Sequence, residues 1–97
     1  MSSKKAASGA EAETLQQIPN IGSEIEKDFH TLGIRQPKDL MNCDPYELYE
    51  RLNIVTSMRH DPCVLDVFIA ATRFMDGSPP VPWWVYTEER KRRMRKN

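Results

Sequence analysis

The stretch LQQIPNIGSEIEKDFHTLGI, residues 15–34, decides the fold that the sequence predicts. Asn20 and Gly22 are residue types that readily adopt positive φ, and with Pro19 they predict a very tight turn between two helices. Gly33 is expected to end the second helix in a left-handed conformation. The apolar side chains recur at steps of three or four and so share one helical face: Leu15, Ile18, Ile21, Ile25, Phe29 and Leu32.

This order of residues is typical of a helix-hairpin-helix motif, although Asn20 stands where the motif usually has its first glycine. Successive backbone N–H groups at such a turn, beside the positive end of a helix dipole, form a concavity that holds phosphate. Contacts of this kind grip a nucleic-acid backbone without reading its sequence. The same turn also packs helices together in domains that bind no nucleic acid, so the turn alone leaves both interpretations open.

Length and composition indicate one small domain with tails. The chain has 97 residues, 39% of them hydrophobic, and a mean hydropathy of −0.64. Residues 1–13 are mostly Ser, Ala, Lys, Gly and Glu, so we expect a flexible tail there, a helical domain over 14–86, and a basic helix or tail over 87–97. No long apolar run or leader pattern is present, and Cys43 and Cys63 suit a reducing interior. These features predict a cytoplasmic protein that does not contact a membrane.

Helix-start signals recur along the middle of the chain. A short helix is expected over residues 38–41. Asp44-Pro45 and Asp61-Pro62 each combine an N-cap residue with a proline suited to the first helical position. We expect the first of these helices to fade near Asn53, and the second, apolar on more than one side, to be central and to end at Gly77.

The prolines of residues 78–82 predict an extended strap that leads to Trp83 and Trp84. The paired tryptophans are either a lid over the bundle or a platform that stacks unpaired bases, and the lid is favoured in a domain this small. A last helix over residues 88–96 has no apolar face, so we expect it to be frayed unless something binds it.

Charge is unevenly distributed. Residues 15–87 carry six basic and ten acidic side chains, a net −4, whereas residues 88–97 carry six basic and two acidic, a net +4. Glu24, Glu26 and Asp28 follow the turn and are opposed there by Lys27 alone. Because a duplex binder depends on several Lys or Arg contacts, the basic tail must supply much of the attraction.

Signals for catalysis are weak. The chain has no HExxH, CxxC or glycine-rich nucleotide loop, so we expect no enzyme, no metal and no cofactor. A nucleophilic Cys63–His60 pair is the alternative to a buried structural thiol. The natural position for a second hairpin, residues 53–60, has neither Gly nor Pro and is not expected to form the same turn. A homodimer would supply a second copy of the first one.

Together these residues resemble the small bacterial pathogenicity-locus family, whose members are often labelled mitomycin-resistance or helix-hairpin-helix proteins. The hairpin half is also similar to the C-terminal domain of TfoX-type competence regulators. The family resemblance implies an all-α, SAM-like helix-hairpin-helix bundle of about five helices with a Pro/Trp strap. The motifs that carry it are Ile18-Pro19-Asn20-Ile21-Gly22, Leu32-Gly33-Ile34, Asp44-Pro45 with Leu48-Tyr49, Asp61-Pro62-Cys63-Val64-Leu65 with Val67-Phe68, and Trp83-Trp84.

The leading hypothesis is a non-enzymatic module that binds DNA or another nucleic acid weakly and without sequence preference. The alternative is a module for protein–protein interaction or dimerisation that binds no nucleic acid. The candidate nucleic-acid contacts are the turn residues Pro19, Asn20, Ile21, Gly22 and Ser23, the nearby Lys27, and the basic residues Arg90, Lys91, Arg92, Arg93, Arg95 and Lys96.

Overall fold

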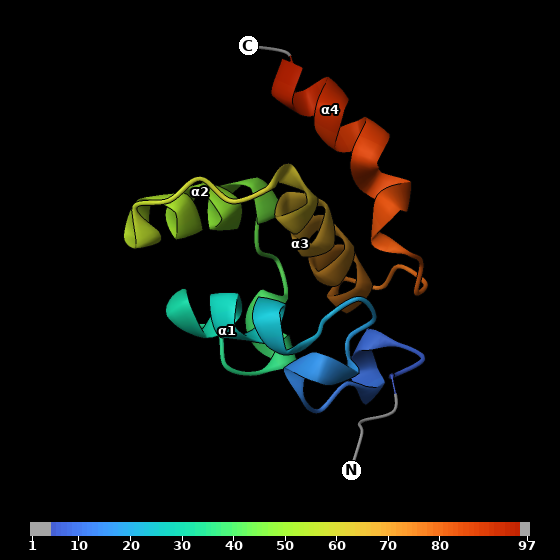
Figure 1. The fold of residues 1–97 in the computed structure, drawn as a ribbon. Coiled ribbons are helices and arrows are strands. Elements are labelled where there is room, and N and C mark those ends of the chain that lie inside the picture. Colours follow the sequence, from blue (N-terminus) through green and yellow to red (C-terminus); the bar gives the residue numbers. More distant parts are fainter. Residues whose placement is uncertain (1–4, 96–97) are drawn as a thin grey trace.

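A computed structural model describes residues 5–95, which form four α-helices joined by turns and short 3₁₀ helices (Figure 1). The all-α prediction is confirmed, and none of the described helices is long and apolar enough to cross a bilayer. The α-helices are α1 (Ser23–Thr31), α2 (Pro45–Thr56), α3 (Pro62–Met75) and α4 (Thr87–Arg95). The 3₁₀ helices are η1 (Gly9–Glu11), η2 (Leu15–Gln17), η3 (Pro37–Leu40) and η4 (Trp83–Tyr86).

Helix α3 lies at the centre of the fold, as its apolar residues on more than one side predict. Leu65, Phe68 and Ile69 are fully buried on it. The ring of Phe68 stacks on that of Phe29 from α1, with centroids 4.9 Å apart. Burying each of these side chains stabilises the fold by roughly 1.5–3 kcal/mol, so α3 organises the elements around it.

The two Asp-Pro signals start α2 and α3 as the sequence predicts. The carboxylate of Asp44 accepts a hydrogen bond from the Tyr46 amide at 2.9 Å, and that of Asp61 accepts one from the Cys63 amide at 2.8 Å. Helix α2 continues to Thr56 instead of fading near Asn53. No residue in between breaks the helix, which ends at Ser57 in a left-handed conformation with φ of 56°.

The Pro19–Ser23 turn reverses the chain with one left-handed residue. Asn20 has φ of 74°, whereas Gly22 has φ of −109°, so the expectation that Gly22 also supplies a positive φ is wrong. Before the turn the chain makes the single 3₁₀ turn η2 in place of a longer helix. After α1, Gly33 is left-handed with φ of 85°, as predicted.

The C-terminal strap is fastened to this turn. The side-chain amide of Asn20 donates a hydrogen bond to the carbonyl of Val81 at 2.9 Å. This contact joins residues 61 positions apart and brings the prolines of residues 79–82 beside the turn. Asn20 therefore provides both the left-handed conformation and a side-chain donor, which a glycine cannot do.

The N-terminal segment lies against the domain from Lys5 onward, although its composition predicts a flexible tail; residues 1–4 of that tail lie outside the described part. The Ala6 amide donates to the Gln17 carbonyl at 2.8 Å. Gly9 sits so close to the end of α3 that an added Cβ would be 2.9 Å from the Phe74 carbonyl oxygen. Glycine is needed at this position because the obstacle is backbone, which cannot move aside.

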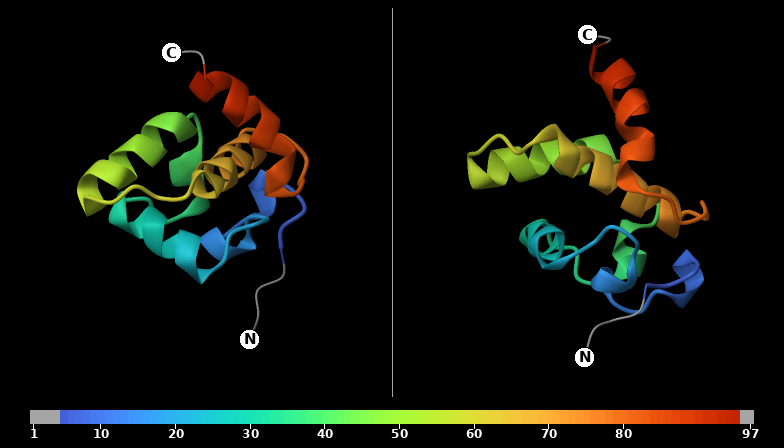
Figure 2. Two further views of the ribbon diagram at one scale, coloured as in Figure 1. Left: turned by 45° about the horizontal axis from the view of Figure 1, so that its top comes forward. Right: turned by 45° about the vertical axis from the view of Figure 1, so that its right-hand side comes forward.

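Helix α4 is held on the body by polar contacts. The carboxylate of Asp66, fully buried on α3, accepts hydrogen bonds from the Thr87 hydroxyl at 2.7 Å and from Arg90 Nε at 2.8 Å and Nη2 at 3.3 Å. Arg73, further along α3, pairs with Glu89 of α4. The expectation of a frayed last helix followed from its lack of an apolar face. These contacts replace apolar packing, and α4 projects from the bundle as a continuous helix (Figure 2).

Arg90→Ala is expected to lower the free energy of unfolding by about 3–5 kcal/mol, because it leaves the buried Asp66 carboxylate without its counter-charge. Arg92→Ala, on the exposed face of the same helix, is the control and should change stability by no more than about 0.5 kcal/mol. Urea denaturation followed by circular dichroism measures both. Equal stabilities for the two variants would contradict the anchoring role of Arg90.

Candidate nucleic-acid interface

The first turn of α1 presents backbone amides that the protein does not cap. Gly22 occupies the N-cap position and offers no side-chain acceptor, whereas the caps of α2 and α3 are aspartates that accept from their own helices. The first intrahelical bond of α1 is donated by Glu26 to the Gly22 carbonyl, at 3.0 Å. The N–H groups of Ser23, Glu24 and Ile25 therefore have no acceptor within the helix.

The free N–H groups lie nearer to the start of α1 than the sequence predicts. Pro19 has no N–H to offer, and the Ile21 amide donates to the Ile18 carbonyl at 3.2 Å. An anion at this end would meet Gly22 and the residues of the first helical turn. A Cβ added at Gly22 would meet no atom within 4 Å, so the space beside the Gly22 Cα is open.

Charges of both signs surround the turn. Glu24 is exposed, while Glu26 accepts a hydrogen bond from the Gln16 side chain at 2.8 Å. Lys5 places its ammonium on the other side, where it donates to the carbonyls of Gln16, Ile18 and Ile21 at 2.7, 3.2 and 2.7 Å. Partial burial lowers the pKa of this ammonium. Sequence reasoning could not place Lys5 here, because the contacts span 11 to 16 residues and follow no local pattern.

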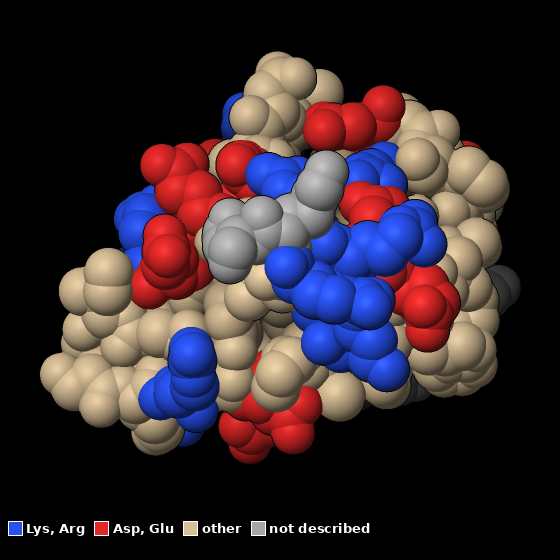
Figure 3. Space-filling model, turned by 90° about the horizontal axis from the view of Figure 1, so that it is seen from above, with Lys and Arg blue, Asp and Glu red and all other residues tan. Residues whose placement is uncertain are grey.

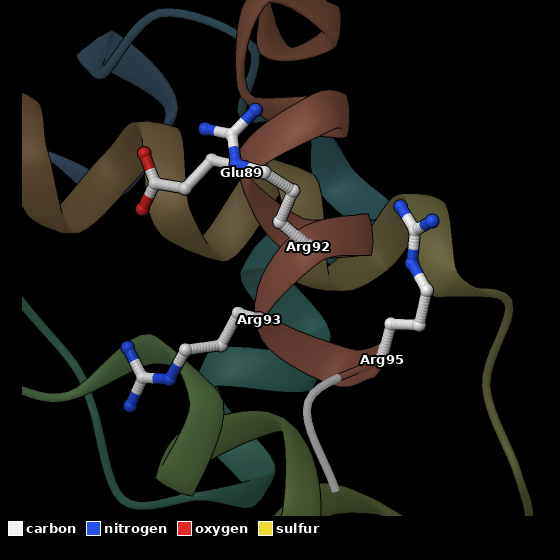
Figure 4. Close-up of a pocket in the computed structure, with 4 residues that line it drawn as sticks. All are labelled: Glu89, Arg92, Arg93 and Arg95. Carbon is white, nitrogen blue, oxygen red and sulfur yellow. The ribbon is translucent and has the colours of Figure 1, made fainter.

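The basic residues predicted as contacts differ in what they do. Arg90 is the anchor of α4, and the guanidinium of Arg93 lies over the Tyr46 ring, 4.2 Å from its centroid. Lys91, Arg92 and Arg95 are exposed. Lys96 lies outside the described residues. The guanidinium groups of Arg92, Arg93 and Arg95 spread around the helix and do not converge on one point (Figure 4).

Seen from the C-terminal end, Lys and Arg side chains gather in a patch flanked by acidic groups (Figure 3). We call the exposed residues Lys91, Arg92 and Arg95 the α4 basic face. The cleft between α2 and α4 is lined in part by Asp44, Glu47 and Glu50, which would repel phosphate. An anion therefore meets α4 most favourably on the side turned away from α2.

The structure does not bring the two parts of the predicted site together. Helix α4 rises at one end of the molecule, and α1 with the N-terminal turns lies at the other (Figures 1 and 2). The longest dimension of the fold is 39 Å. Lys27, on α1, belongs to the turn end and is exposed there. The two parts of the candidate site are therefore separate surfaces and not a single pocket.

The loop between α2 and α3 uses its own amides, in agreement with the expectation that it does not repeat the first turn. The side-chain oxygen of Asn53 accepts from the His60 amide at 2.9 Å, and its carbonyl accepts from the Met58 amide at 3.1 Å. The Tyr49 hydroxyl donates to the His60 carbonyl. The Cys63 amide is bound by the Asp61 cap, so few backbone N–H groups of this loop are free to bind a phosphate.

The cysteines show no sign of activation. Cys63 is exposed, so its interpretation as a buried thiol is wrong, and the adjacent Asp61 carboxylate raises the pKa of its thiol. A raised pKa reduces the thiolate population that a nucleophile needs. Within residues 5–95, no group of three or more His, Cys, Asp or Glu side chains is placed to hold a metal ion.

A family model described as Pathogenicity locus matches residues 8–92, most of the chain. The chain belongs to the pathogenicity-locus family. It is also similar to Mitomycin resistance protein McrB of Streptomyces lavendulae, with 41% identity over 78 residues, which cover 80% of this chain and 74% of that protein. No solved structure is significantly similar to this chain. The family resemblance drawn from the motifs is confirmed, and the similarity to TfoX-type regulators stays a prediction.

Gly22→Ser is expected to raise the free energy of unfolding by a few tenths to about 1 kcal/mol. Serine suits the φ of −109° at this position, caps the α1 amides and restricts the unfolded chain. Gly33→Ser is the control and should lower stability by roughly 1–2 kcal/mol, because its φ of 85° strains a residue with a Cβ. Thermal and urea unfolding of the two variants measure whether the free energy of unfolding rises or falls. A loss of stability in Gly22→Ser would show that the first turn of α1 is not an open cap.

Proposed function

We propose that this protein is a non-enzymatic module that binds nucleic acid weakly and without sequence preference. The observation that carries the proposal is the way α4 is held. The buried Asp66 fixes the helix through Thr87 and Arg90, while Lys91, Arg92 and Arg95 remain exposed on it. A helix that has no apolar face, yet is anchored so that its cations face solvent, suits the binding of a polyanion.

The charge distribution supports α4 as the main source of attraction. Residues 15–87 carry a net −4, so a nucleic acid gains little from approaching the rest of the body. Cations that displace condensed counterions supply most of the affinity in sequence-independent binding. The amides at the start of α1 then provide a second contact, as expected of a helix-hairpin-helix turn. No base-reading group is required, so sequence preference is not expected.

The distance between the contacts sets the length of nucleic acid that reaches both. Screening at about 0.1 M salt limits the field of α4 to roughly 10 Å, so each contact acts separately. A duplex rising about 3.4 Å per base pair covers the 39 Å longest dimension of the molecule in roughly a dozen base pairs, so a probe of that length can reach both contacts. Probes of only a few base pairs would reach one contact at a time and bind more weakly.

The substitution Arg92→Gln/Arg95→Gln is expected to weaken binding to oligonucleotides long enough to span the molecule. It should also reduce the slope of log K against log salt by up to about 1.4 for single strands and 1.8 for duplex, because two phosphate contacts are lost. Arg35→Gln/Lys38→Gln makes the same charge change at exposed positions outside α4 and is the matched control. Fluorescence anisotropy across a salt series measures both variants.

Equal losses in the two double variants would refute a role for α4, and the absence of binding by the unaltered protein at low salt would refute the proposed function. Deleting residues 88–97 is a poorer test, because it also removes the Arg90 side chain that neutralises Asp66. The substitutions leave this anchor in place, so a loss of affinity reports on phosphate contact and not on unfolding.

One observation favours the alternative, a module for protein–protein interaction or dimerisation. The end of α2 and the loop after it expose three large apolar side chains: Ile54 at 72%, Val55 at 59% and Met58 at 55%. Adjacent exposed apolar side chains are typical of surfaces that contact another protein. No charged group of α4 belongs to this cluster, so the two functions would use different surfaces.

If the apolar cluster joins two copies of the chain, Ile54→Ser/Met58→Ser should convert a dimer into a monomer without lowering stability, because both side chains are already exposed. Sedimentation across a wide concentration range measures the change. Met41→Ser, at another exposed methionine, is the control and should leave the dimer intact. A protein that is monomeric at every concentration would rule out dimerisation through this cluster.

A further inference from the structure

The two tryptophans of η4 have different environments. Trp83 is partly buried and packs against the hydrophobic core, as a lid would. Trp84 is 62% exposed. The two rings meet edge to face, with centroids 5.6 Å apart and an interplanar angle of 82°. Trp83 thus holds the neighbouring ring in place while Trp84 turns a large aromatic surface toward solvent.

The exposed ring borders a shallow hollow beside the Pro19–Ser23 turn. Its walls are Pro19, Asn20, Pro80, Val81, Pro82 and Trp84. The Asn20–Val81 hydrogen bond closes the far side by holding the strap on the turn. Proline rings and a fastened strap restrict motion in these walls, so little conformational entropy is lost when a flat group lies against Trp84.

The position of the hollow connects the two anion contacts. On one side it is built from the turn that leads into α1. On the other side the chain passes from Trp84 to Thr87 and directly into α4. A strand attracted by the α4 basic face and running toward the amides of α1 therefore passes the exposed ring.

We infer that Trp84 stacks an unpaired base, so that single-stranded nucleic acid is the preferred ligand. This inference rests on the proposed function. The bases of a duplex are covered by their neighbours and present no free face to a protein ring, whereas every unpaired base has a face to stack. Charge argues for a nucleic acid over an apolar peptide, because the strap continues into α4, which exposes four cations, Lys91, Arg92, Arg93 and Arg95, against one exposed carboxylate, Glu88.

The test compares two single-stranded probes of equal length and charge, a thymidine 16-mer and an abasic 16-mer. Trp84→Ala is expected to weaken binding to the thymidine strand about tenfold, because one base–aromatic stack is lost, and to leave binding to the abasic strand unchanged. Trp84→Phe should retain most of the affinity. Val85→Ala, at an exposed apolar neighbour, is the matched control and should behave like the unaltered protein.

Urea unfolding of each variant confirms that folding is intact, as the exposure of Trp84 leads us to expect. If Trp84→Ala binds the thymidine strand as tightly as the unaltered protein does, the stacking role is overturned. The proposed function would then still stand, provided Arg92→Gln/Arg95→Gln weakens binding. A protein that binds neither probe but binds a duplex of equal length would overturn the inference alone, and one that binds none of the three would overturn both. Binding of a proline-rich peptide that depends on Trp84, without binding of either strand, would assign the hollow to a protein partner and overturn the inference.

Discussion

The structure depends on the buried carboxylate of Asp66, which needs a counter-charge and hydrogen-bond donors. Asp66 is fully buried on the central helix, and a charge in that position is tolerated when hydrogen bonds and an opposite charge compensate it. Both come from α4, through the Thr87 hydroxyl and the Arg90 guanidinium. The need to neutralise one buried group thus determines where the most basic segment of the chain lies. The same contacts hold α4 in a fixed position, although this helix has no apolar face.

A second fixed point joins the two ends of the sequence. Asn20 stands where the predicted helix-hairpin-helix motif has a glycine, and the structure shows what it does there. Its left-handed backbone makes the turn, and its side chain binds the strap at Val81. The strap then carries Trp83 into the core and leaves Trp84 outside it. Lys5 crosses from the N-terminal segment to three carbonyls around the same turn, so the region is held from both termini.

Features set by neighbours in sequence were predictable, and features set by distant polar contacts were not. Asp44 and Asp61 cap helices through amides two residues away, and Gly33 ends α1 within one turn, so short spacings reveal them. The Asp66–Arg90 pair joins residues 24 positions apart and leaves no periodic signal, which is why α4 looked like a helix that nothing holds. The same distinction applies to the residues predicted to contact nucleic acid. Arg92 and Arg95 are exposed as expected, while Arg90 forms an ion pair with Asp66 inside the fold.

The connections that lead into α1 and α3 differ in a way that would limit the affinity of the proposed nucleic-acid binding. Both lead into an α-helix, but α3 begins with an aspartate cap and a loop whose amides bind Asn53, while α1 begins with a glycine that caps nothing. Under the proposed function, one open helix start gives one phosphate contact, and the exposed Glu24 opposes even that one. Affinity would then have to come from groups outside the helical pair, namely the cations of α4 and the face of Trp84. Because neither group reads base edges, we propose that a module built this way binds weakly and tolerates any sequence.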